Sequence, residues 1–195
     1  MSDALLQNWQ DAFWQTSQAY EASQRLRHAA STERLAIWTQ ELTTVVIGAC
    51  SALGWKAAAK RNVLDYLPVP REEYLSLDVM AFAGNGKTWE FPIAVMELEN
   101  SKSDVTVGYS LWKVLCVRAE LRLVYCYRRN VDESTRLLEY LTAEVFQAFK
   151  TEDRAKIGGR TIVVVGSKSD AHRFPYDFFK WRELDHGTGK FGSVI

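Results

Sequence analysis

The chain of 195 residues is long enough to bury one sizeable hydrophobic core and short for two. Hydrophobic residues make up 47% of it, which excludes an intrinsically disordered protein, and no linker rich in Pro, Gly or Ser divides it. The 24 basic and 24 acidic residues cancel, which excludes the global positive field of many nucleic-acid-binding proteins, although a local basic patch stays open. We therefore expect a single folded domain over residues 1–195.

The cysteines and the N-terminus indicate a cytoplasmic protein. Cys50, Cys116 and Cys126 each lie in an apolar run, and no two of them have the C-x-x-C spacing. This odd set is typical of reduced core thiols and argues against a structural zinc site. No basic segment precedes an apolar one at the N-terminus, and no window reaches the roughly 18 apolar residues of a membrane span. We expect no membrane contact.

Two long helices are predicted at the start of the chain. Leu6, Trp9 and Phe13 recur three or four residues apart within residues 3–30, which is typical of an extra N-terminal amphipathic helix. We expect this helix to lie against the core, with a dimer contact as the alternative. Residues 31–61 have the same periodicity and end in basic residues, which predicts a second helix, with a break near Gly48 or Gly54 as an alternative. Glu41 lies on or beside its apolar face, an unusual place for a free carboxylate.

The rest of the chain predicts alternating strands and helices. Beyond Pro68 and Pro70, we expect two strands, at 74–82 and 89–98, around a hairpin turn at 84–87. We then expect a helix at 105–119, a strand at 121–127, a helix at 132–149 with Asp132 as its N-cap, and a strand at 161–165. The strand at 121–127 is continuously apolar, as expected of a central strand covered on both faces. An aromatic segment at 174–184 is expected to pack on the domain, followed by a loose tail at 185–195. The order predicts an α/β fold with a mixed sheet flanked by helices.

Three carboxylates lie in strands that otherwise favour burial, namely Asp78 in the first strand of the hairpin and Glu97 and Glu99 in the second. Because side chains alternate between faces, Asp78 shares a face with both glutamates in either of two registers. A two-residue turn leaves Glu97 about 13 Å beyond the residue opposite Asp78. An open hairpin, with a loop over residues 84–91, instead puts Asp78 directly opposite Glu97.

Converging carboxylate oxygens suit Mg²⁺ or Mn²⁺, which are hard cations that prefer oxygen ligands. Burial of a carboxylate otherwise costs several kcal/mol, so a divalent cation accounts for the position of these side chains. The alternative is that Glu97 and Glu99 lie on a solvent-facing side of an edge strand. The sequence therefore predicts a metal site only if the hairpin is open.

The motif of Asp78, a hairpin, Glu97-Leu98-Glu99, a helix and a strand resembles the PD-(D/E)XK nuclease superfamily. This resemblance implies a restriction-endonuclease-like αβββαβ core within residues 31–130, with residues 131–184 adding a helix, a strand and the aromatic segment. It also implies that Asp78 and Glu97 bind Mg²⁺ or Mn²⁺ and that Glu41 adds a further metal ligand. Glu99 occupies the position that the superfamily usually gives to lysine, and Lys113 or Lys102 are candidates to replace that lysine.

Two other patterns bear on function. The segment Gly84–Thr88 is similar to the end of a phosphate-binding loop, but it lacks the first glycine and leads into a strand, so we reject a nucleotide site. Four arginines flank the central strand and are candidates for contacts to nucleic-acid phosphates, with a solvated rim as the alternative: Arg118, Arg122, Arg128 and Arg129.

These patterns together predict a metal-dependent nuclease that hydrolyses phosphodiester bonds in DNA, with RNA as an alternative substrate, in a restriction, defence or repair role. The alternative is a catalytically inactive module of the same fold that binds nucleic acid, a protein partner or a second copy of itself. The balanced net charge and the glutamate at position 99 favour this alternative, whereas the carboxylates in apolar strands favour the nuclease.

Overall fold

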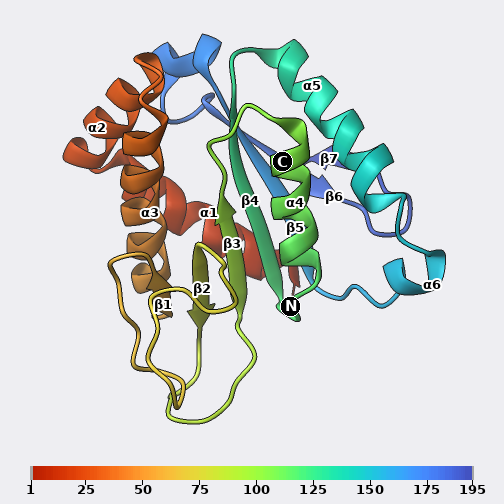
Figure 1. Ribbon diagram of the computed structural model, residues 1–195. Helices are drawn as coiled ribbons and strands as arrows, with labels where there is room; N and C mark the ends of the chain where they lie inside the picture. Colours follow the sequence, from red (N-terminus) through yellow and green to blue (C-terminus); the bar gives the residue numbers. More distant parts are fainter. Residues whose placement is uncertain (1, 195) are drawn as a thin grey trace.

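The computed structural model describes residues 2–194 and has an α/β architecture (Figure 1). Within these residues seven strands form one mixed sheet in the order of the sequence. The strands are β1 (Lys56–Ala59), β2 (Val79–Phe82), β3 (Ala94–Leu98), β4 (Leu121–Arg128), β5 (Arg160–Ser167), β6 (Phe179–Leu184) and β7 (Phe191–Ser193). The helices are α1 (Ser2–Gln18), α2 (Tyr20–Ser31), α3 (Leu35–Ala52), α4 (Asp104–Leu115), α5 (Val131–Tyr140) and α6 (Thr151–Arg154), with a π-helical turn η1 (Leu141–Phe146) and a 3₁₀ segment η2 (Lys168–Arg173).

The three central strands of the sheet, β3, β4 and β5, are parallel, and every other neighbouring pair is antiparallel. All eight residues of β4 are buried, which confirms the prediction of a central strand from its continuous apolar sequence. Helices α4 and α5 make the two crossovers between the parallel strands. The carboxyl ends of β3, β4 and β5 therefore meet at one edge of the sheet.

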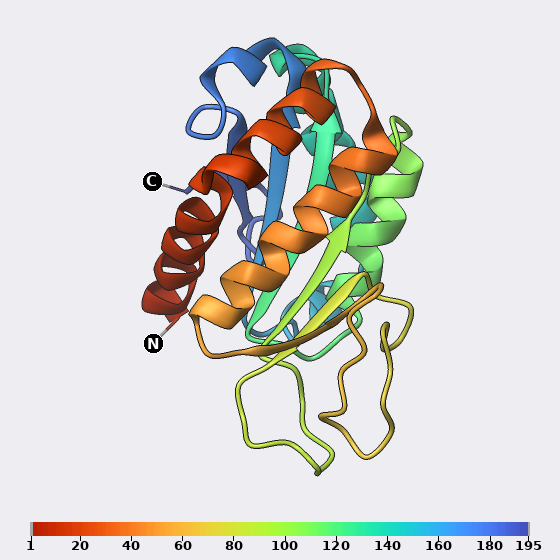
Figure 2. The ribbon, with the colours of Figure 1, turned by 90° about the vertical axis from the view of Figure 1, so that its left-hand side faces the viewer.

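Helices cover both faces of the sheet (Figure 2). One hydrophobic core joins α1, α2 and α3 to one face and includes Val79 and Met96, while a second core joins α4 and α5 to the other face and includes Met80 and Val95. Because side chains alternate along a strand, Asp78 and Glu97 lie on the same face as Met80 and Val95. The sheet thus directs both carboxylates toward α4.

The predicted helices at the N-terminus differ from the observed ones. The single helix expected over residues 3–30 is two helices, because Ala19 adopts extended dihedrals (φ −52°, ψ 129°). The helix expected over residues 31–61 ends at Ala52, which agrees with the alternative break near Gly54, and it is followed by strand β1, whose sequence is Lys-Ala-Ala-Ala. Strand β1 pairs with β2 and supplies a strand that the sequence pattern missed.

The C-terminal residues are more ordered than the sequence predicts. The aromatic segment expected at 174–184 contains strand β6, and the tail expected to be loose contains β7, which pairs with β6 through Leu184 and Phe191. Pairing at the end of the sheet therefore orders residues whose Gly-rich sequence alone does not favour a strand.

Helix α3 is, among the described residues, the helix whose length and apolar composition satisfy the requirements of a membrane span. Six of its side chains are buried in the first hydrophobic core: Trp38, Leu42, Val45, Val46, Ala49 and Cys50. Core helices of globular domains have the same composition, so this feature is weak evidence for a membrane span.

Helix α5 begins two residues earlier than predicted, since its N-cap is Asn130 instead of Asp132. The Asn130 side chain accepts a hydrogen bond from the Glu133 backbone N–H (2.9 Å), and the Glu133 carboxylate accepts one from the Arg129 backbone N–H (2.9 Å). The two bonds satisfy two backbone donors at the helix start, in a variant of the capping box in which Glu133 reaches the residue before the N-cap.

Substitution Asn130→Ala is expected to lower the free energy of unfolding by about 1 kcal/mol, because the Glu133 N–H loses its acceptor. Urea denaturation followed by circular dichroism measures this change. The control Asp132→Ala removes a carboxylate from the same helical turn but no capping bond, so we expect a loss of only a few tenths of a kcal/mol. Equal losses in the two variants would show that Asn130 is not the cap.

Candidate active site on strands β2 and β3

The pairing of β2 with β3 follows the open-hairpin register. Val79 pairs with Met96 and Ala81 with Ala94, so Asp78 stands directly opposite Glu97 at the next position. The loop between the strands covers residues 83–93, slightly longer than the predicted loop. Asp78 Oδ2 accepts a hydrogen bond from the Leu98 backbone N–H at 2.7 Å, which fixes this carboxylate at the beginning of β2.

Glu97 is the most buried carboxylate of the cluster, with 5% of its side chain exposed. Lys113 on α4 brings its Nζ to 2.8 Å from Glu97 Oε1 and also donates to the Ser76 carbonyl at 2.7 Å. The Lys113 ammonium is thus the cationic partner of this buried oxygen. The structure thus brings Asp78, Glu97 and Lys113 together.

The pKa of Glu97 is raised from 4.5 to about 7, mainly because burial disfavours the charged carboxylate and also because Asp78 repels it. The Lys113 ammonium and the Ser110 hydroxyl lower this pKa and so oppose the effect of burial. Near neutral pH the metal-free protein therefore holds Glu97 close to the midpoint of its titration.

Glu99 lies at the carboxyl end of β3, where the resembled superfamily usually has lysine. Its Oε1 accepts from the Ser101 N–H (2.7 Å) and its Oε2 from the Ser110 hydroxyl (3.3 Å). Ser110, one turn before Lys113 on α4, is a residue that the sequence analysis missed, although the i, i+3 spacing of the two places them on one helix face. Of the two candidate lysines, the structure brings Lys113 to Glu97, whereas Lys102 pairs with Glu33 at 3.2 Å.

Glu41 does not join the other carboxylates. Helix α3 covers the face of the sheet opposite to α4, and the Glu41 carboxylate accepts from Arg25 Nε of α2 at 2.7 Å. The prediction of a buried-face glutamate is confirmed only in part, since 15% of its side chain is exposed. Its carboxylate is paired with an arginine that the packing of α2 on α3 brings near. The periodicity of α3 alone cannot predict this partner.

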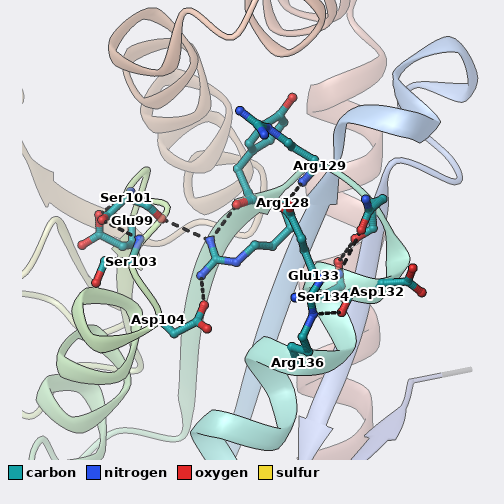
Figure 3. A network of polar contacts seen from close by, with 12 residues as sticks. Glu99, Ser101, Ser103, Asp104, Arg128, Arg129, Asp132, Glu133, Ser134 and Arg136 are labelled. Carbon is teal, nitrogen blue, oxygen red and sulfur yellow. Dashed lines mark hydrogen bonds and ion pairs between the residues drawn. The ribbon is translucent and has the colours of Figure 1, made fainter.

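The four arginines around β4 do not form one surface, contrary to the sequence-based expectation. Arg122 and Arg128 are buried, with 3% and 4% exposure. Arg128 donates to Asp104 (2.7 Å) and to the Ser101 carbonyl (3.1 Å), as Figure 3 shows. Arg118 and Arg129 are exposed but lie at opposite ends of β4. Arg122 and Arg128 therefore stabilise the fold and are not available to phosphates in this conformation.

The donor set at the site fits Mg²⁺ or Mn²⁺ as a pair of carboxylates. Mg²⁺ in proteins is often held by only one or two carboxylates, together with water and substrate phosphates. Asp78 and Glu97 face each other across two strands, and Glu97 Oε1 is buried beside the Lys113 ammonium. Among the described residues, no group of three or more His, Cys, Asp or Glu side chains is arranged to hold a metal ion. The protein can therefore offer such a cation two carboxylates, but not a complete set of ligands.

Comparison of the chain with known protein families, with curated proteins and with solved structures found no match. Assignment of a function therefore depends on the geometry of the chain itself.

Proposed function

We propose that this protein is a Mg²⁺- or Mn²⁺-dependent nuclease with a restriction-endonuclease-like core, hydrolysing DNA phosphodiester bonds in a restriction, defence or repair role. The observation that carries the proposal is the opposition of Asp78 and Glu97 on adjacent strands, with Lys113 Nζ 2.8 Å from Glu97. The succession α3, β1, β2, β3, α4 and β4, with β3 and β4 parallel, supports the proposal because it has the same order as an αβββαβ core. RNA is the alternative substrate.

Each residue of the cluster has a separate role in this proposal. Asp78 and Glu97 hold the cation, and the Leu98 N–H orients Asp78 through its hydrogen bond. A bound divalent cation supplies an activated water and neutralises charge on the phosphate. Lys113 favours the ionised form of Glu97, and its ammonium is positioned to stabilise negative charge on the substrate. Glu99 is held by Ser101 and Ser110 and acts as a further acceptor at the edge of the site.

The test is hydrolysis of plasmid and single-stranded DNA in Mg²⁺ or Mn²⁺ by the wild type and by Asp78→Asn and Glu97→Gln. Both variants are expected to lose activity by at least about tenfold, because each removes one of two ligands while keeping the side-chain shape. The control Glu152→Gln removes an exposed carboxylate on α6 and is expected to retain full activity. Undiminished cleavage by both Asp78→Asn and Glu97→Gln would refute the assignment.

A second candidate function is a non-catalytic module that binds nucleic acid, a protein partner or a second copy of the chain. The ion pair between Lys113 and Glu97 favours this reading, because the protein itself already supplies a cation to the buried carboxylate. Titration calorimetry with Mn²⁺ separates the two candidates. A wild type that binds no Mn²⁺ at millimolar concentration and cleaves no DNA supports the module.

A further inference from the structure

A polar cleft of about 550 Å³ lies between helix α3 and the turn that follows strand β1. Its walls include Thr39, Gln40 and Thr43 on α3, Lys60 and Arg61 on the turn, and Asn100 beyond β3. Strand β1 lies beside α3, as Figures 1 and 2 show. The volume is within the range of small-molecule pockets, so the cleft accommodates a unit about the size of a nucleotide and not a whole duplex.

The side chains of this cleft favour an anion. The ten described residues that line it include two cations and six uncharged polar residues but no acidic one. Lys60 and Arg61 are exposed, and neither forms an ion pair with any described residue. The Gln40 side-chain amide likewise has no hydrogen-bond partner among the described residues. Free cations and amides in a concave surface are the groups that bind the oxygens of phosphodiesters.

Hydrogen bonds fix the backbone of the turn that carries the two cations. Backbone hydrogen bonds join Ala59 and Asn62 in both directions, at 3.3 and 2.8 Å, and the Asn62 side chain donates to the Ala57 carbonyl at 2.7 Å. Arg61 has a φ of +65°, in the left-handed region that favours glycine. The sequence thus has a guanidinium at a backbone position where glycine is the usual residue.

The cleft lies at the same edge of the sheet as the candidate active site, but on the face that α3 covers, whereas Asp78 and Glu97 point toward α4. Ala59 pairs with Val79, so Lys60 follows β1 beside the position at which Asp78 precedes β2. Adjacent strands lie about 4.8 Å apart, which places the turn and Glu97 on opposite sides of Asp78. Asn100 follows Glu99 directly, and its side chain donates to the Thr39 hydroxyl on α3 at 2.8 Å. A DNA strand that lies in the cleft therefore reaches Asp78 by crossing the edge of the sheet where β1 ends and β2 begins, next to Lys60 and Arg61.

We infer that this cleft binds the phosphate backbone of a single DNA strand, with Lys60 and Arg61 contacting the phosphates next to the one held at Asp78 and Glu97. The inference deepens the proposed function and rests on it. No aromatic side chain lines the cleft among the described residues, so the contacts are to phosphate and sugar and carry no sequence preference.

The test is binding of a fluorescent single-stranded oligonucleotide to the full chain in EDTA, measured by anisotropy over a range of salt concentrations. In Lys60→Gln/Arg61→Gln, affinity at about 0.1 M salt is expected to fall at least tenfold, and the slope of log affinity against log salt to become shallower by about 1.4. The matched control Lys56→Gln/Lys150→Gln removes two exposed, unpaired lysines outside the cleft and is expected to bind like the wild type. The variant Lys60→Arg/Arg61→Lys keeps both positive charges and is expected to bind the oligonucleotide with an affinity close to that of the wild type.

Three results would overturn the inference. They are no binding of the oligonucleotide by the wild type, equal affinity and salt slope in the cleft and control variants, and competition by inorganic phosphate or a mononucleotide as strong as that by unlabelled oligonucleotide. The proposed function fails separately. If the protein binds the oligonucleotide through Lys60 and Arg61 but cleaves no DNA in Mg²⁺ or Mn²⁺, the nuclease proposal is refuted and the binding cleft is supported. If the wild type cleaves DNA but Lys60→Gln/Arg61→Gln binds the oligonucleotide as the wild type does, only the binding cleft is refuted.

Discussion

The variant Arg122→Met is expected to unfold with a free energy about 3 kcal/mol lower than that of the wild type, because hydrogen bonds to a charged group contribute about 1.5–3 kcal/mol each. The Arg122 guanidinium is 3% exposed and donates to three backbone carbonyls, those of Val114 (3.0 Å), Val117 (2.8 Å) and Gly158. Methionine fills similar space but donates no hydrogen bond. The carbonyls of Val117 and Gly158 then lose the only hydrogen bonds that described residues make to them.

The loss is partly offset because burial of Arg122 is itself unfavourable. Burial lowers the pKa of its guanidinium, while the Glu120 carboxylate raises it. Thermal denaturation is expected to show a Tm decrease on the order of 10 °C, since about 1 kcal/mol corresponds to roughly 2–4 °C in a domain of this size. The matched control Arg118→Met replaces an exposed arginine in the same crossover, whose guanidinium lies 4.4 Å from the centre of the Phe91 ring. A change of more than about 1 kcal/mol in the control, or of less than that in Arg122→Met, would contradict this account.

The position of Arg122 illustrates why the arginine surface predicted from the sequence was wrong. Arg122 and Arg128 have the same parity along β4 as Val124 and Cys126, which belong to the core under α4 and α5. Alternation alone therefore places both arginines inside the molecule. The presence of four arginines around one strand suggested phosphates, but charge alone does not decide which face a residue occupies. The carbonyls at the end of α4 and in the loop before β5 satisfy Arg122 instead.

Strand β1 could not be predicted from its own residues. Lys56–Ala59 follows a long apolar helix, and alanine has the highest helix propensity of any residue. Pairing of Ala57 with Ala81 and Ala59 with Val79 makes it a strand, and these partners lie twenty or more residues away. The cleft beside the Lys60–Arg61 turn was missed for the same reason, since it exists only because the helix stops before β1.

The register of β2 and β3, in contrast, follows from local chemistry. The alternation of side chains along a strand places Asp78 and Glu97 on one face in either register. The observed pairing of Val79 with Met96 is the open-hairpin register, which is the one that puts the two carboxylates next to each other. Lys113 was one of two candidate lysines, and the packing of α4 on the sheet selects it. Glu41 is different, because its partner lies on another helix. One helix reports that a residue borders the apolar face, but it does not report that Arg25 of another helix lies there.

In EDTA, the wild type is expected to lose about 3 kcal/mol of unfolding free energy through Glu97 as the pH rises, and Glu97→Gln is expected to remove this loss, since each pKa unit corresponds to about 1.4 kcal/mol. The pKa of Glu97 rises from 4.5 to about 7 on folding, chiefly through burial. Below pH 4.5 the carboxyl is protonated in the folded and unfolded states. Between pH 4.5 and 7 the unfolded chain releases the proton and the folded chain keeps it, so the wild type loses stability as pH rises through this window. Glutamine is neutral in both states and removes that loss.

Urea denaturation in EDTA at pH 4.5, 6, 7 and 8 measures the effect as the difference between Glu97→Gln and wild type, which is expected to grow in favour of the variant as pH rises. In Lys113→Met the cation that lowers the pKa of Glu97 is absent, so the wild-type loss is expected to extend to higher pH. Glu152→Gln, at an exposed site on α6, should leave the wild-type curve unchanged. A constant difference across the window would mean that Glu97 titrates as an exposed carboxyl. A growing difference would mean that the fold keeps, at neutral pH, a carboxylate that destabilises it, and such a residue is explained more readily by a ligand at Asp78 and Glu97 than by packing.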